Sequence, residues 1–171
     1  MPKKNSRARR TRREPKKRVR YAVVGLGWFA QTAVLPAFAH ARDSSELAAL
    51  VSDEPEKLKK LGRKYRVDRL YSYEEYPRCL ADGDIDAVYV VVPNDLHRDY
   101  AVAAAEAGIH VLCEKPMAVT EEECEDMISA AEVNRVRLMI AYRLHFEEAN
   151  LRAVEIVNSG KIGEPRIFSS V

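Results

Sequence analysis

The sequence predicts an α/β domain in which helices cover both faces of a doubly wound parallel β-sheet. Short apolar runs alternate with longer stretches of helical character from residue 21 to about residue 142. One run, residues 87–92, is apolar throughout, which is typical of a strand buried on both faces of a parallel sheet. Because the linking segments are short, the repeated strand–helix order indicates parallel strands joined by crossover helices.

The elements follow from these runs in chain order. Six runs are expected to form strands: residues 21–25, 47–52, 70–71, 87–92, 109–113 and 137–141. The expected helices cover residues 30–40, 55–65, 72–80, 96–107, 120–134 and 148–159. Pro36 lies inside the first helix and should end or kink it. Residues 166–171 are interpreted as the start of a further strand that has no partner left in the chain.

Local signals support several helix starts. Pro55 suits the first position of a helix, where its missing N–H is not needed. Ser72 with Glu75, and Thr120 with Glu123, have the spacing of a capping box, in which a hydroxyl and a carboxylate satisfy the first free N–H groups of a helix.

Residues 1–20 are strongly basic. They hold eleven Lys or Arg and one acid, Glu14, so the rest of the chain carries a net charge of −8 within a total of +2. We expect a disordered, solvated segment; loose binding to nucleic acid or anionic surfaces, and an arm ordered against a partner subunit, are the less favoured alternatives. The segment has no apolar core of the kind that a secretory signal needs, so we expect a cytoplasmic protein.

The composition is that of an ordinary soluble globular protein, with 47% hydrophobic and 32% charged residues. No apolar run reaches the roughly 20 residues that would span a bilayer, so we expect no membrane contact. Three cysteines, Cys79, Cys113 and Cys124, lack the spacing of metal or redox motifs and fit reduced thiols. We predict no metal site.

A glycine-containing hexapeptide at residues 25–30 follows the first predicted strand and opens a helix. It fits the pattern G-x-G-x-x-A, which carries weight in that context. Gly25 permits a tight turn, Gly27 lets a pyrophosphate approach the backbone, and Ala30 allows close helix–strand packing, while the helix N-terminus supplies N–H groups and partial positive charge. The pattern predicts a Rossmann dinucleotide-binding domain rather than a chance glycine turn. The cofactor-binding residues predicted here are Gly25, Gly27, Trp28, Phe29 and Ala30.

A carboxylate, Asp53, closes the second predicted strand, 28 residues after Gly25. It can accept hydrogen bonds from an adenosine ribose and would repel a 2′-phosphate, although it also suits a helix cap. Ser52 and Lys57 could instead hold a 2′-phosphate. The cofactor is therefore NAD or NADP, with NAD slightly favoured.

Polar residues also follow the fourth strand. Ligands bind outside the carboxyl ends of strands in open parallel sheets, so the loop that starts at Pro93 should face the cofactor. Asn94 offers donors and acceptors for a ribose or carboxamide, or alternatively caps the next helix. His97, at the start of that helix, suits either the site or the surface.

Glu114 and Lys115 follow the fifth strand. The Lys115 ammonium could hydrogen-bond a hydroxyl that is being oxidised and stabilise negative charge developing on its oxygen, which makes Lys115 the predicted catalytic residue. Glu114 could pair with Lys115 or bind the nicotinamide ribose. The plain alternative is an exposed Glu–Lys pair before a proline turn.

Taken in order, Gly-Leu-Gly-x-x-Ala, Val-Pro-Asn-x-x-His and Cys-Glu-Lys-Pro-Met-Ala closely resemble the glucose–fructose oxidoreductase, inositol dehydrogenase and rhizopine-catabolism family. Residues 138–143, Leu-Met-Ile-Ala-Tyr-Arg, resemble most its glucose–fructose oxidoreductase branch. The resemblance covers about residues 21–171. It implies a nicotinamide cofactor at the glycine loop and a hydride-transfer site with a sugar or polyol. That implied site is lined by Asn94, His97, Glu114 and Lys115, with Tyr142 and Arg143 nearby.

The sequence departs from the family in three ways. Relatives of the glucose–fructose type that hold NADP tightly tend to have a small residue where this chain has Asp53. The exported branch carries a twin-arginine signal with an apolar core, which residues 1–20 lack. The family also has a second domain, built on a large antiparallel sheet, that forms the substrate pocket and the subunit contact, and only its start is present here.

The expected organisation is therefore a basic segment (1–20), a Rossmann domain (21–142), and the connecting helix and first strand of a second α+β domain (143–171). A homo-oligomer is compatible with this organisation. The favoured function is hydride transfer between a nicotinamide cofactor and a sugar or polyol hydroxyl, and a non-catalytic dinucleotide-binding module is the alternative.

Overall fold

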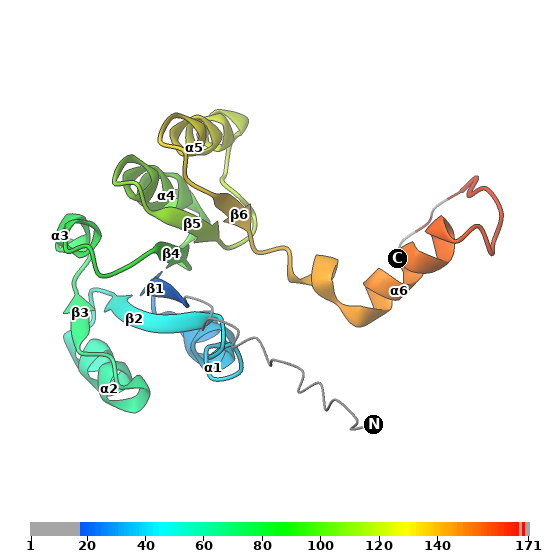
Figure 1. Cartoon of the computed structure of the whole chain (residues 1–171). Coiled ribbons are helices and arrows are strands. Elements are labelled where there is room, and N and C mark those ends of the chain that lie inside the picture. The colour runs from blue at the N-terminus through cyan, green and yellow to red at the C-terminus, as the bar shows by residue number, and fades with distance from the viewer. Residues whose placement is uncertain (1–17, 168, 170–171) are drawn as a thin grey trace, which may run out of the picture.

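The computed structural model describes residues 18–167 and 169, and in them one parallel sheet of six strands organises the chain (Figure 1). The strand order is β3-β2-β1-β4-β5-β6. The strands are β1 (Val19–Val24), β2 (Ser45–Val51), β3 (Arg69–Tyr71), β4 (Ala87–Val90), β5 (His110–Cys113) and β6 (Leu138–Ile140). Every neighbouring pair is parallel. The order reverses direction between β1 and β4, and this switch point is where ligands bind in such sheets.

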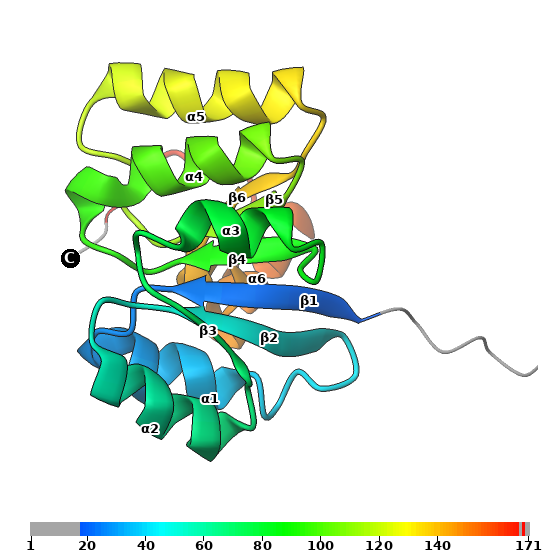
Figure 2. The ribbon, with the colours of Figure 1, turned by 90° about the vertical axis from the view of Figure 1, so that its left-hand side faces the viewer.

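Helices cover the sheet on both sides. Figure 2 shows α3, α4 and α5 on one face and α1 and α2 on the other. The helices are a π-helical segment η1 (Ala30–Val34), α1 (Leu35–Ala37), α2 (Pro55–Tyr65), α3 (Tyr76–Ala81), the 3₁₀ segment η2 (Asn94–Leu96), α4 (His97–Glu106), α5 (Glu121–Val133), the 3₁₀ segment η3 (Arg143–Phe146) and α6 (Glu148–Asn158). This is the predicted Rossmann architecture.

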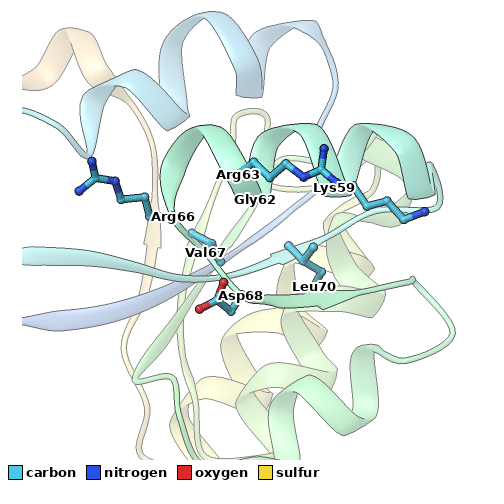
Figure 3. A pocket seen from close by; sticks show the side chains of 7 residues that line it. All are labelled: Lys59, Gly62, Arg63, Arg66, Val67, Asp68 and Leu70. Carbon is cyan, nitrogen blue, oxygen red and sulfur yellow. The ribbon is translucent and has the colours of Figure 1, made fainter.

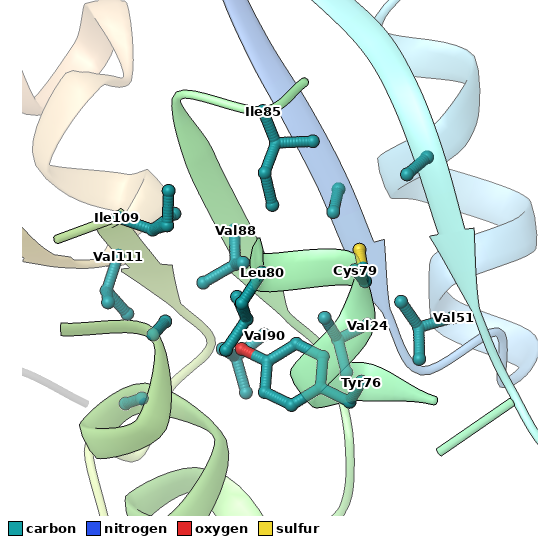
Figure 4. Packing of buried hydrophobic residues seen from close by; sticks show 14 of the residues in the cluster. Val24, Val51, Tyr76, Cys79, Leu80, Ile85, Val88, Val90, Ile109 and Val111 are labelled. Carbon is teal, nitrogen blue, oxygen red and sulfur yellow. The ribbon is translucent and has the colours of Figure 1, made fainter. Parts of the chain in front are cut away.

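Each face of the sheet has its own apolar core. Side chains of β1, β4 and β5 meet Tyr76 and Leu80 of α3 on one face (Figure 4). On the other face, Leu35, Leu50 and Leu61 pack between the sheet and the two N-terminal helices. Completely burying side chains of this kind contributes about 1.5–3 kcal/mol each. The two cores fix the strand ends that carry the polar residues of the site.

Close packing of α2 on β3 depends on Gly62. A Cβ at this position would lie 2.8 Å from the carbonyl oxygen of Val67 and 3.0 Å from a methyl of Leu70. Figure 3 shows these residues side by side where the helix turns back toward the strand. Arg66 ends the helix in the left-handed region, with a φ of 59°.

Both predicted capping boxes form. The Thr120 hydroxyl accepts a hydrogen bond from the Glu123 N–H, and the Glu123 carboxylate accepts one from the Thr120 N–H. Ser72 and Glu75 exchange the same two bonds, although regular helix begins only at Tyr76.

The first helix differs from the prediction. Helical residues begin at Trp28, five residues adopt a π-helix, and α1 ends at Ala37 rather than at residue 40. Pro36 has no N–H with which to continue an α-helical ladder, and just before it the Leu35 N–H donates to the Ala30 carbonyl in the wider π-helical pattern. Pro36 therefore alters the helix, as expected, and the geometry changes in the turns before it.

Two boundaries also differ. Val19 and Arg20, which the sequence placed in the basic segment, belong to β1, and Arg20 forms an ion pair with Asp86 at 3.0 Å. The predicted strand at 166–171 is wrong for its described residues, because Arg166, Ile167 and Ser169 lie outside any strand. The remaining residues of that stretch, and residues 1–17 of the predicted segment, lie outside the described part of the chain.

After β6 the chain leaves the sheet, and α6 projects away from it (Figure 1). Its apolar side chains stay largely uncovered: Leu151, Val154 and Val157 are 50%, 57% and 39% exposed. None of the described helices combines the length and the apolar character that crossing a membrane would require.

Candidate cofactor and active site

The glycine turn after β1 is held against two neighbouring strands. The Gly25 N–H donates a hydrogen bond to the Val51 carbonyl of β2, at 3.0 Å. Gly25 has a φ of +96°, and a Cβ there would lie 2.6 Å from the carbonyl oxygen of Val91, just after β4. Gly25 is therefore required both by backbone conformation and by the close approach of β4.

Gly27 stands in a different environment. A Cβ on Gly27 would meet no atom within 4 Å. Nothing in the described protein fills the space in front of this residue, at the point where the helical turn begins. The open space and the helix start together fit a dinucleotide, whose diphosphate would lie against bare backbone at Gly27.

A cavity of about 410 Å³ opens beside this turn, within the size range of small-ligand sites. It is lined by Phe29, Val91, Val92, Asn94, His97, Glu114, Lys115 and Arg143. These residues follow β1, β4, β5 and β6, so four strand ends contribute to one site. Five predicted site residues beyond the glycine loop are thus brought together.

Glu114 is held in place from two sides. It is 7% exposed, and the Tyr89 hydroxyl donates a hydrogen bond to its Oε1 at 2.6 Å. The Lys115 backbone N–H donates to its Oε2 at 3.2 Å. Burial, together with the hydrogen bond to Glu114, raises the pKa of Tyr89, so this hydroxyl stays a donor at neutral pH.

Two cations face the same cavity without a carboxylate partner among the described residues. Lys115 is exposed and its ammonium has no hydrogen bond or ion pair there. The Arg143 guanidinium lies over the Phe29 ring, 5.2 Å from its centroid. Because Glu114 is occupied by Tyr89 and a backbone N–H, the Lys115 ammonium is left available to a ligand hydroxyl. The Glu114–Lys115 side-chain pair, one of the two alternatives considered for Glu114, does not form in the described chain.

His97 connects two loops through contacts of its ring with their backbone oxygens. It is 1% exposed, with Nδ1 2.9 Å from the Pro116 carbonyl and Nε2 3.0 Å from the Val92 carbonyl. Both ring nitrogens are thus engaged by backbone oxygens that follow β4 and β5. His97 is among the residues that line the cavity, and its ring positions the loop that carries Lys115.

The residues at the end of β2 lie apart from this cavity. Asp53 is exposed, and its Oδ1 accepts a hydrogen bond from the Tyr73 N–H at 3.2 Å. The Ser52 side chain is buried, with its hydroxyl 3.5 Å from the Glu54 N–H, and Lys57 pairs with Glu54. Ser52 is thus buried and Lys57 is paired, whereas the exposed Asp53 carboxylate keeps its second oxygen without a hydrogen bond to any described residue.

Three predicted residues stand at the margin of the site, outside the lining of the cavity: Trp28, Pro93 and Tyr142. Trp28 and Tyr142 are 77% and 57% exposed. The prediction missed Tyr89, which lies inside β4, in a run interpreted as wholly apolar. A buried hydroxyl needs a hydrogen-bond partner, and that need was the available signal. No group of His, Cys, Asp or Glu within the described chain is arranged to hold a metal ion.

The comparison with known proteins agrees with this geometry. Residues 19–142 match the Gfo/Idh/MocA family model, described as an oxidoreductase family with an NAD-binding Rossmann fold. The chain belongs to this family. As a Gfo/Idh/MocA protein, it shares 40% identity over 148 residues with a D-xylose 1-dehydrogenase [NADP(+)] of Haloarcula marismortui; the match covers 86% of this chain and 41% of that protein.

Solved Gfo/Idh/MocA structures superpose closely. An aldose–aldose oxidoreductase from Caulobacter crescentus, complexed with glycerol, is 45% identical with a TM-score of 0.82, over 86% of this chain and 44% of that chain. The WlbA dehydrogenase from Bordetella pertussis, in complex with NADH and UDP-GlcNAcA, is 28% identical with a TM-score of 0.77, over 86% and 44%. The chain thus spans less than half the length of these relatives.

Proposed function

We propose that this chain binds a nicotinamide dinucleotide across the carboxyl ends of its strands and moves a hydride between that cofactor and a sugar or polyol hydroxyl, together with a substrate-binding portion. The observation that carries the proposal is the cavity in which Lys115 faces the ligand space beside the open Gly27 turn. The bound nicotinamide would supply the hydride chemistry.

The protein's own residues would bind the cofactor, orient the substrate and polarise its reacting hydroxyl. Gly27 and the first helical turn would receive the diphosphate. Asn94 and Glu114 would hold the nicotinamide ribose or carboxamide, with Trp28, Pro93 and Tyr142 at the rim. Lys115 would donate a hydrogen bond to the reacting hydroxyl oxygen and stabilise the charge that develops there. Arg143 stacked on Phe29 would close the side of the site.

A substitution of Lys115 separates binding from chemistry. In Lys115→Met, made in a protein that also carries the substrate-binding portion, we expect the affinity for NADH to stay within about threefold. Turnover across a panel of sugars and polyols should fall by about 10²–10⁴, the usual contribution of a positioned acid–base group. Lys60→Met, on the exposed side of α2, is the matched control and should leave both unchanged.

The second candidate function is a non-catalytic dinucleotide-binding module, because the family model that matches residues 19–142 describes an NAD-binding Rossmann fold. Cofactor binding without turnover on any sugar or polyol, measured in a protein that also carries the substrate-binding portion, would establish the module and remove the catalytic proposal. Absence of NADH and NADPH binding at millimolar concentration would remove both.

We further propose that NAD is preferred over NADP. Asp53 presents a carboxylate at the end of β2, where a ribose would lie, and Lys57 is already paired with Glu54. In Asp53→Ser we expect the ratio of NADPH to NADH affinity to rise at least tenfold, because about 1.4 kcal/mol of like-charge repulsion is removed. Fluorescence titration with each reduced cofactor measures the ratio. A ratio unchanged by the substitution would contradict this role for Asp53.

The segment after the Rossmann domain has exposed apolar side chains on α6. We propose that residues 143–171 lead into the substrate portion, which would cover Leu151, Val154 and Val157 and could form a homo-oligomer contact.

We also propose a cytoplasmic location. Cys79, Cys113 and Cys124 are all free thiols, and burial raises the pKa of Cys79 and of Cys113 to about 12, so both stay protonated.

A further inference from the structure

Glu114 is a buried acid in the candidate site, and two cations line the same cavity. Lys115 is its neighbour in the chain, and Arg143 follows β6. A carboxylate that is 7% exposed needs donors for its oxygens, and a nearby ammonium or guanidinium is a common source of them. In the described chain neither cation serves as that donor, because Glu114 forms no ion pair with Lys115 or Arg143.

The Tyr89 hydroxyl is the donor instead, and the register of the sheet brings it to the carboxylate. Tyr89 of β4 pairs with Leu112 of β5. Glu114 follows Leu112 by two residues, and side chains two residues apart lie on the same face of a strand, so Glu114 is a diagonal neighbour of Tyr89. The Glu114 N–H also donates to the Val90 carbonyl at 3.0 Å, which extends the pairing of the two strands as far as the site.

The ring of Tyr89 is held by the apolar core. It packs against the buried cluster that contains Val23, Leu35 and Leu50. The hydroxyl at its end donates to Oε1 of Glu114 at 2.6 Å, and burial raises the pKa of this hydroxyl, which keeps it a donor. Replacing Tyr89 by Phe would therefore keep the packing of the ring and remove the donor alone.

We propose that Tyr89 is a positioning residue of the site, whose hydroxyl competes with Lys115 for the Glu114 carboxylate and so keeps the Lys115 ammonium free for a ligand. Without the hydroxyl, Oε1 of a buried carboxylate would lack a donor, which is unfavourable. The flexible Lys115 side chain would then supply one, because Arg143 already lies over the Phe29 ring. This competition needs no cofactor or substrate, whereas its consequence for hydride transfer rests on the proposed function.

The test is the rate at which acetic anhydride acetylates Lys115 in the full chain at mildly alkaline pH, followed by peptide mass spectrometry. The unprotonated amine is the form that reacts, and pairing with a carboxylate would hold the amine protonated. In Tyr89→Phe we expect the Lys115 rate to fall at least about tenfold, the usual effect of an opposite charge in contact. Lys60, exposed on α2, is the internal reference and should react equally in every variant.

Two comparisons separate positioning from damage to the fold. In a Glu114→Gln background, Tyr89→Phe should change the Lys115 rate by less than about twofold, because the charge that would capture Lys115 is gone. Tyr76→Phe is the matched control: it removes another buried hydroxyl, which donates to the Tyr100 carbonyl at 2.9 Å in the other core, and it should leave the Lys115 rate unchanged. Thermal melts check that each variant is folded.

The wild-type background offers a further measurement that needs no Tyr89 variant. Glu114→Gln alone should change the Lys115 rate by no more than about threefold, since Tyr89 already holds the carboxylate. A large rise in that rate would mean that Glu114 and Lys115 are paired in the wild-type chain, and it would overturn the proposal. An unchanged rate in Tyr89→Phe, or an equal fall with Glu114 and with Gln at position 114, would overturn it too. NADH binding is measured separately, so failure of the proposed function gives a different result.

Discussion

Gly25→Ala is expected to lower the free energy of unfolding by about 2–4 kcal/mol, since it combines an unfavourable φ with an overpacked contact. The φ of Gly25 is +96°, and the new methyl would lie 2.6 Å from the Val91 carbonyl oxygen and 2.8 Å from the Val92 nitrogen. Both neighbours are backbone atoms of the central strand region, so they cannot move away as a flexible side chain could. Urea unfolding followed by circular dichroism measures the change.

Gly27→Ala is the matched control, because its methyl would enter open space. It should change the free energy of unfolding by no more than about 0.5 kcal/mol, as for other surface substitutions. Equal stability of the two variants would contradict the packing described for Gly25, and with it the way in which β4 supports the glycine turn.

Gly27→Asp is expected to abolish most cofactor binding while the fold stays intact. The carboxylate would occupy the space in which the diphosphate is proposed to lie. Two like charges about 4 Å apart near a protein surface repel by up to about 4 kcal/mol, so NADH affinity should fall at least about 100-fold. Isothermal titration calorimetry with NADH measures the loss, and a thermal melt confirms folding.

The isosteric Gly27→Asn separates charge from volume. It should weaken NADH binding less than Gly27→Asp, because the amide fills the same space without the negative charge. If Gly27→Asp binds NADH as tightly as the wild-type chain, the diphosphate does not lie at this turn.

The fold could be predicted largely from local pattern. The apolar run of β4 and the glycine turn after β1 identify a parallel sheet and the switch point between β1 and β4. The element boundaries that were predicted wrongly depend on pairing between segments far apart in the sequence. The backbone ladder of β1 extends to Val19 because it pairs with Ser45 of β2, which no local feature of the basic segment reveals. A strand beyond residue 165 would need a neighbouring strand to pair with.

The sequence predicted which residues gather at the site better than it predicted the contacts that these residues make. Residues after strand ends were correctly expected to converge, and Asn94, His97, Glu114, Lys115 and Arg143 line one cavity. Their partners were not predictable, because Tyr89 and Glu114 are 25 residues apart and meet only through the register of β4 and β5. Likewise, the sequence places His97 at a helix start, and only the fold shows that both its nitrogens contact backbone oxygens.

The most direct test of the central claim is an NMR titration of the ¹⁵N-labelled chain with NADH and, separately, NADPH. We predict large shifts of the amide signals of residues 25–30, shifts for Asn94 and Lys115, and little change in α6. Unmoved signals at residues 25–30 with either cofactor at saturating concentration would contradict a diphosphate site at the first turn of this sheet.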